Sequence, residues 1–238
     1  MGQRRNKPGK SARDMADKKY LKRVGIVFLG VAGLIVCANI LKSGMTKGWG
    51  IALLVFIVAI VVVIKTVVES KSKTLKKEEN RAERGAKAEE SVSDILESLG
   101  GERSIFHDVD TGRGDIDHIV LSRKHGLFLI ETKSHHGEVT IRDGRLLIDG
   151  KEPEKDFIAQ TLRNTLWLRD RIKEKTGIEI WVQPVIVFTN GFVKEWKPVR
   201  GILLRNSKYL LKAMEENEPR GDAHLRLWER IAGGGGLW

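Results

Sequence analysis

The chain has 238 residues, enough for one domain with an additional segment or for two small domains. Its 42 Lys and Arg residues exceed its 31 Asp and Glu residues, but the whole excess of +11 lies in residues 1–80, because residues 81–238 hold 26 of each sign. Net charge therefore gives no reason to assign nucleic-acid binding to the C-terminal part. The single cysteine, Cys37, excludes a disulfide framework and a cysteine zinc site.

Two runs without charged residues, 24–41 and 49–64, dominate the N-terminal third. The first has 18 residues, which as a helix gives about 27 Å, close to the hydrocarbon thickness of a bilayer. The second reaches residue 68 if the Lys65 ammonium group snorkels to the interface. These runs predict a transmembrane hairpin with helices at 24–41 and 49–68. A pair of buried core helices is the alternative interpretation. A signal peptide is disfavoured, because no small-residue cleavage pattern follows the first run.

The distribution of basic residues predicts the orientation of this hairpin. Nine Lys and Arg residues lie in residues 1–23, and five more lysines follow the second run, whereas the loop at 42–48 has only two. The positive-inside rule then places both termini in the cytosol. The predicted localisation is a cell membrane with two spans, and anionic lipid headgroups are a predicted partner of the basic flanks.

The cytosolic part reads as alternating helices and strands. A charged helical linker at 69–83 leads into the main domain at 84–217, and a helix with a Gly-rich tail follows at 218–238. Turn residues and apolar periodicity predict helices near 84–99, 155–175, 207–216 and 223–231, and strands at 104–109, 115–121, 127–132, 139–141, 145–148, 181–188 and 201–204. This order predicts an α/β fold with one mixed sheet flanked by helices.

Two acidic residues lie near the same edge of this predicted sheet, Asp117 near the start of one strand and Glu131 near the end of the next. If the strands at 115–121 and 127–132 form a hairpin, Leu121 faces Leu127 and Asp117 faces Glu131, with Cβ atoms about 4.5–5.5 Å apart. Opposed carboxylates repel each other, and a divalent cation would remove that conflict. Lys133 lies two residues beyond Glu131 on the same face, where it would orient a water or neutralise a phosphate. The set suits metal-assisted hydrolysis of a phosphodiester.

The segments 114–120 and 126–133, followed by Gly137, resemble the nuclease-related domain (NERD), a branch of the PD-(D/E)XK nuclease superfamily. The resemblance covers residues 84–209. It implies a restriction-endonuclease-like sheet, a Mg²⁺ site (or Mn²⁺) at Asp117 and Glu131, and Lys133 as the catalytic lysine. The implied partner is nucleic acid, with DNA favoured over RNA. A second copy of the chain, in a homo-oligomer, is a further candidate partner.

Two further residues match positions of this family. Glu89 corresponds to its helix-borne glutamate, and it shares the apolar stripe of Val92 and Leu96, where a buried acid needs a partner. Gln160 corresponds to the family's glutamine. Each has an alternative interpretation as an ordinary surface residue of its helix.

Other candidate sites are weaker. Alternation turns His118 away from the Asp117 face, and the adjacent His135 and His136 point in opposite directions in an extended chain, so no zinc site is predicted. Aromatic and basic residues near Trp167 and Trp196 are too sparse to predict base stacking.

Three functions compete. The first is a membrane-anchored, metal-dependent nuclease that hydrolyses phosphodiester bonds on the cytosolic side. The second is a catalytically inactive nuclease-like domain that binds nucleic acid or a protein, and the third is a membrane scaffold. The combination of Asp117, Glu131 and Lys133 favours the first, because a binding module does not need apposed carboxylates beside a lysine.

Overall fold

The computed structural model describes residues 50–235, together with scattered helical positions between residues 13 and 35. The chain divides into two compact units, one at residues 12–83 and one that contains everything from Arg84 onward. Helix α2 (Gly50–Glu97) crosses this boundary, and its last turns, from residue 84, belong to the second unit. The candidate site lies in that second unit.

The predicted two-span localisation in a cell membrane is wrong, because no helix among the described residues combines the length and the apolar character that a membrane span needs. The uncharged part of α2 ends at Ile64 and has 15 residues. As a helix this part measures about 22 Å, against roughly 30 Å for a hydrocarbon core. Beyond it, Lys65 forms an i, i+4 ion pair with Glu69. The predicted first span, 24–41, falls mostly at positions outside the described residues.

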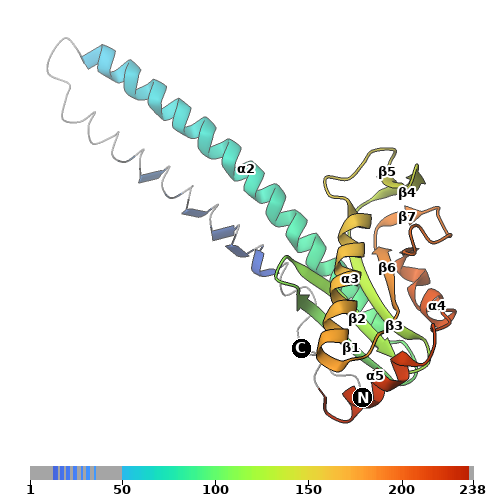
Figure 1. Cartoon of the computed structure of the whole chain (residues 1–238). Helices are drawn as coiled ribbons and strands as arrows, with labels where there is room; N and C mark the ends of the chain where they lie inside the picture. The colour runs from blue at the N-terminus through green and yellow to red at the C-terminus, as the bar shows by residue number, and fades with distance from the viewer. Residues whose placement is uncertain are drawn as a thin grey trace. The chain divides into compact units, whose positions relative to one another are not determined.

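A five-stranded mixed sheet forms the centre of the second unit (Figure 1). Its strands lie in the order β1-β2-β3-β6-β8, with β1, β2 and β3 antiparallel and β3, β6 and β8 parallel. The bounds are β1 Arg103–Asp110, β2 Asp115–Ser122, β3 Gly126–Lys133, β6 Val182–Phe188 and β8 Leu203–Asn206. The central strand β3 is buried along almost its whole length, as expected for a strand covered on both faces.

A second, three-stranded sheet has the order β5-β4-β7. It consists of β4 (Gly137–Arg142), β5 (Arg145–Ile148) and β7 (Gly191–Val193). Asp143 and Gly144 connect β4 and β5 with φ of 52° and 73°, the two positive values that a tight hairpin turn requires. The sequence predicted the β4–β5 hairpin but not β7, which joins this sheet by parallel pairing with β4.

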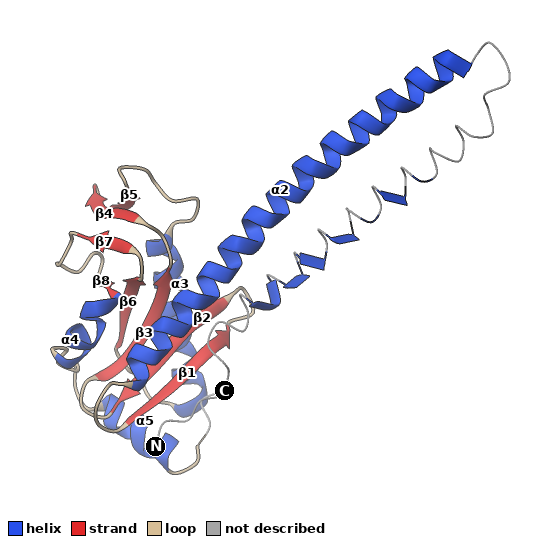
Figure 2. Cartoon of the chain, turned by 180° about the vertical axis from the view of Figure 1, so that it is seen from behind, coloured by secondary structure: helices blue, strands red, loops and turns tan. Residues whose placement is uncertain are grey.

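Helices cover both faces of the five-stranded sheet. On one face lie α3 (Phe157–Thr176) and α5 (Ala223–Ala232) (Figure 1). Their Leu168 and Leu227 belong to the same buried cluster as apolar side chains of β2 and β3. On the other face lie the end of α2 and the short α4 (Leu210–Glu215), which follows a 3-10 turn at Ser207–Tyr209 (Figure 2). The result is a three-layer α/β fold with a mixed sheet between two helical layers.

Helix α3 has defined ends that fix its register over the sheet. The side chain of Asp156 accepts a hydrogen bond from the Ala159 N–H at 2.9 Å, and Gly177 ends the helix in the left-handed conformation at φ 72°. This register matters because α3 contributes side chains to the candidate site.

Two leucines of α3 test this packing, since Leu168 is fully buried and Leu166 is exposed. We expect Leu168→Ala to lower the free energy of unfolding by about 2–5 kcal/mol, because it leaves a cavity between helix and sheet. Leu166→Ala is the matched control and should change it by less than about 0.5 kcal/mol. Urea unfolding of the full chain measures both, and equal effects would contradict the packing described here.

Candidate active site

The hairpin of β2 and β3 has the predicted register, but it opens where the acidic residues begin. Leu121 pairs with Leu127 and Ile119 with Leu129, and the last backbone pair is His118 with Ile130. Asp117 therefore does not form a regular cross-strand pair with Glu131. Instead, its Oδ2 accepts a hydrogen bond of 2.6 Å from the Thr132 N–H, which fixes the Asp117 carboxyl against β3 between Glu131 and Lys133.

Glu131 is the centre of the site. Its side chain is 0 % exposed, and its two oxygens accept hydrogen bonds from three side chains. Lys133 Nζ and Gln160 Nε2 each lie 3.2 Å from Oε2, and Asn164 Nδ2 lies 2.7 Å from Oε1. A buried carboxylate requires such donors, because it has lost the water that would otherwise solvate it.

Helix α3 supplies two of these three donors. Gln160 and Asn164 are four residues apart, so they lie on the same face of the helix, one turn from each other. The sequence predicted Gln160 but missed Asn164. Its spacing from Gln160 was the available signal, since a helical face that presents one amide to a buried carboxylate presents the residue four positions later as well.

Lys133 is held between a carboxylate and an aromatic ring. Its side chain is 12 % exposed, and Nζ lies 5.0 Å from the centre of the Phe157 ring at the start of α3. Burial acts to lower the pKa of Lys133, but the negative charges of Glu131, Asp117 and Glu89 outweigh it and the pKa is raised. The side chain is therefore a stable cation at neutral pH.

The other two predicted carboxyl groups belong to the same electrostatic group. Burial is the main cause that raises the pKa of Asp117 well above its ordinary value, followed by Glu131 and Glu89, while Lys133 acts in the opposite direction. Burial also raises the pKa of Glu89 from 4.5 to about 7, and the charge of Asp108 adds to this effect. The structure thus brings all five predicted site residues together, with Glu89 close enough to interact by charge.

Asp108 is an acidic neighbour that the sequence did not predict. It lies on β1 between His107 and Val109, whose pairing with His118 and Ile116 places it opposite Asp117. Its φ of 48° is unusual for a residue other than glycine, and such conformations cluster at functional sites. Pairing of the flanking residues of β1 and β2 could have indicated that Asp108 lies opposite Asp117. The positive φ of Asp108 could not be predicted from its residue type.

The donor set of this cluster consists of carboxylate oxygens, which are the ligands that Mg²⁺ and Mn²⁺ prefer. Asp117 and Glu131 could hold such an ion, with Glu89 beside them. Across residues 50–235 and the scattered positions before them, however, no three His, Cys, Asp or Glu side chains are arranged as a ready-made ligand set. Hydrogen bonds from Lys133 and from the two side-chain amides of α3 stabilise the Glu131 carboxylate instead.

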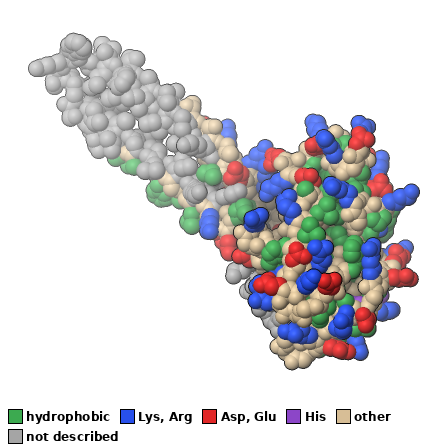
Figure 3. All heavy atoms as spheres, viewed as in Figure 1, with side chains coloured by type: hydrophobic (Ala, Val, Ile, Leu, Met, Phe, Trp, Pro, Cys, Tyr) green, Lys and Arg blue, Asp and Glu red, His purple; other side chains and the backbone are tan. Residues whose placement is uncertain are grey.

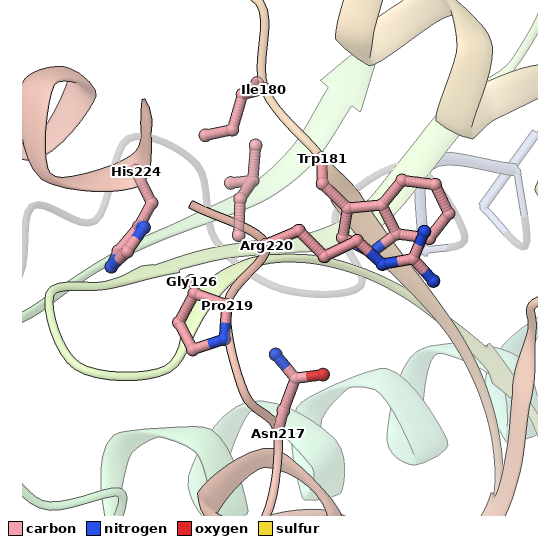
Figure 4. Close-up of a pocket in the computed structure, with 8 residues that line it drawn as sticks. Gly126, Ile180, Trp181, Asn217, Pro219, Arg220 and His224 are labelled. Carbon is pink, nitrogen blue, oxygen red and sulfur yellow. The ribbon is translucent and has the colours of Figure 1, made fainter. Parts of the chain in front are cut away.

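A small pocket elsewhere in the unit is separate from this cluster. Gly126, Trp181, Pro219, Arg220 and His224 line it, and it has room for about one water molecule (Figure 4). Gly126 begins β3 and Lys133 ends it, so the pocket and the carboxyl cluster lie at opposite ends of the same strand, about 23 Å apart. The pocket does not extend the candidate site.

Comparison with known proteins places this site within a recognised domain. The sequence model of the nuclease-related domain matches residues 84–189. These residues are therefore similar to the NERD family. No curated protein and no solved structure matches the chain.

The NERD domain supports a nuclease-related function and is consistent with nucleic-acid binding. Its span includes all five predicted site residues and Asn164, and it ends at Thr189. The match is shorter than the predicted resemblance to residue 209, so β7, β8 and the residues between them lie outside it.

Strands β1 and β2 contain a buried histidine pair next to Asp108 and Asp117 in the sequence. His107 and His118 are 0 % exposed, and their Nδ1 atoms lie 2.9 Å apart. Burial, with a smaller effect of His107, lowers the pKa of His118 to about 3. His118 is therefore neutral in the folded protein.

This lowered pKa predicts a loss of stability in acid. The His118 contribution is complete above the unfolded pKa of about 6.5 and is lost progressively as the pH falls toward 3, because the unfolded chain then takes up a proton that the folded chain excludes. Between about pH 7 and pH 5 the free energy of unfolding should fall by about 2 kcal/mol less in His118→Leu than in the wild type. The exposed His136 gives the control, since His136→Leu should keep the wild-type slope. An unchanged slope in His118→Leu would contradict the prediction.

Proposed function

We propose that this protein is a metal-dependent nuclease that hydrolyses phosphodiester bonds of nucleic acid, with DNA as its main substrate. The observation that carries the proposal is the buried Glu131 carboxylate, which joins Lys133 of its own strand to Gln160 of α3 beside the Asp117 carboxyl. The NERD match to residues 84–189 supports the same reaction class.

Asp117 and Glu131 would hold a Mg²⁺ ion, for which Mn²⁺ would substitute. The raised pKa values of Asp117 and Glu89 support this assignment, because they reflect buried carboxyl groups that also lie close to other carboxylates, and a bound cation would stabilise their charged forms. The bound cation would supply Lewis-acid charge at the phosphodiester. Gln160 and Asn164 would keep the Glu131 carboxylate in a fixed orientation, as outer hydrogen-bond partners of metal ligands do.

Lys133 would act as a cation rather than as a base. Its raised pKa keeps the proton on Nζ, so the ammonium group can neutralise a phosphate oxygen or orient a water that attacks phosphorus. The Glu89 carboxyl, with a pKa of about 7, can exchange a proton in the neutral range, where a catalytic acid or base works best. Glu89 is therefore the residue that we assign to proton transfer near the site.

A second function, nucleic-acid binding without cleavage, has an observation in its favour. Both oxygens of Glu131 already accept hydrogen bonds, and the described part of the chain contains no preformed set of three metal ligands. In that case Lys133 would serve as a structural counter-ion of Glu131. Cleavage assays with and without a divalent cation separate the two functions.

We expect the full chain to nick plasmid DNA with Mg²⁺ or Mn²⁺ and to lose this activity in EDTA. Glu131→Gln and Lys133→Met should each lower the rate by about 100- to 1000-fold, because the first weakens binding of the cation and the second removes positive charge that stabilises the transition state. Asn164→Ala should lower it by about 10- to 100-fold through the orientation of Glu131. The rate of product formation on agarose gels measures all three.

Asp170→Asn is the control, since Asp170 is an exposed acid of the same helix that pairs with Arg169. It should leave the rate unchanged. Metal-dependent cleavage that survives both Glu131→Gln and Lys133→Met would overturn the assignment of the site. Binding of DNA without cleavage under any metal condition would support the second function instead.

A further inference from the structure

An aromatic and basic cluster lies outside the NERD match, on β8, the 3-10 turn that follows it and the segment after β7. The indole of Trp196 contacts the Tyr209 ring edge to face, with ring centres 4.9 Å apart. The Arg205 guanidinium lies 5.2 Å from the centre of the Trp196 ring, and Lys208 Nζ lies 4.6 Å from the centre of the Tyr209 ring. We call these four residues the aromatic–basic patch.

The rings of this patch are not used to fill the core. The side chain of Trp196 is 54 % exposed, although a large aromatic ring normally gains free energy by burial. Phe192, on the neighbouring strand β7, is exposed as well. Exposed rings held by cations provide a flat surface on which nucleic-acid bases stack.

The charge of the segment is concentrated, unlike that of the rest of the domain. Residues 191–209 contain five basic residues and one acidic residue, while residues 81–238 are neutral as a whole. Over the face drawn in Figure 3, by contrast, basic and acidic side chains are interspersed. Arg205 is only partly exposed, and its Nη1 donates a hydrogen bond to the Leu204 carbonyl at 2.8 Å. The Glu216 carboxylate acts on it by charge, but no ion pair between them is found among the described residues. A half-buried cation in this state favours an anionic ligand.

The strand that carries Arg205 lies two strands away from the strand that carries Lys133. Phe188 of β6 pairs with Lys133 on one side and with Asn206 of β8 on the other. Two strand spacings therefore separate the backbones of Lys133 and Asn206 by about 10 Å.

We propose that the aromatic–basic patch binds single-stranded nucleic acid, with a base stacked on Trp196 and with Arg205 and Lys208 at the phosphates. The inference rests on the proposed function, because the bound strand is taken to be the one that leads to the cleavage site. Binding itself can be measured without cleavage, so the two proposals fail separately.

The test is fluorescence anisotropy of a labelled oligothymidylate of about twelve nucleotides, titrated with the full chain in EDTA. Trp196→Ala should raise the Kd by roughly 5- to 150-fold, which is the usual effect of removing one aromatic ring on which a base stacks. Trp196→Phe should restore most of the affinity because it keeps a ring. Arg205→Ala with Lys208→Ala should lower the slope of log K against log salt by about 1.4, because each phosphate that is no longer neutralised reduces it by about 0.7.

Trp181→Ala provides a matched control. Trp181 is 38 % exposed and has the Arg220 guanidinium 3.7 Å from its ring centre, but it precedes β6 at the end far from Lys133. This variant should keep the wild-type Kd. Equal Kd values for Trp196→Ala, Trp181→Ala and the wild type would overturn the proposal. Binding of polyglutamate as tight as that of the oligothymidylate would also overturn it and would indicate an acidic protein partner. Loss of oligonucleotide binding in Trp196→Ala supports the patch even if no variant cleaves DNA.

Discussion

The buried carboxylate of Glu131 is the interaction on which the rest of the site depends. A carboxylate without water is stable only when donors replace the lost solvation, and three side chains do so here. Two of them belong to α3, so the helix must lie over β3 in one register. The same register places Phe157 against Lys133, and the cap at Asp156 and the stop at Gly177 define the ends of the helix that carries it.

This arrangement links the fold to the chemistry. The hairpin of β2 and β3 is a regular ladder as far as His118 and opens beyond it, and the Asp117 carboxyl then binds the Thr132 N–H of the neighbouring strand. The opening brings Asp117, Glu131 and Glu89 into one electrostatic group with a single lysine. Burial, followed by the charge of neighbouring carboxylates, raises the pKa of Asp117 and Glu89. The proposed divalent cation would offset that negative charge.

Much of this geometry was predictable from residue order. Apolar alternation and the five-residue connection predicted the register of β2 and β3. The resemblance to the nuclease-related domain, rather than residue order, indicated Gln160, which donates to Glu131. Long-range features were not predictable: Asn164 acts only because α3 lies over Glu131, and Trp196 meets Tyr209 only because β8 returns beside β7. The two-span localisation failed because apolar composition alone does not show where a helix continues as a charged one.

The most direct measurement of the central claim is calorimetric titration of the full chain with Mn²⁺ at pH 7 in two buffers of different ionisation enthalpy. If Asp117 and Glu131 form a cation site beside Glu89, and the pKa values of Asp117 and Glu89 are raised, binding must release protons, and the apparent enthalpy must differ between the buffers. Asp117→Asn should abolish the binding. Binding of equal affinity in Asp117→Asn, or no binding by the wild type, would contradict the account.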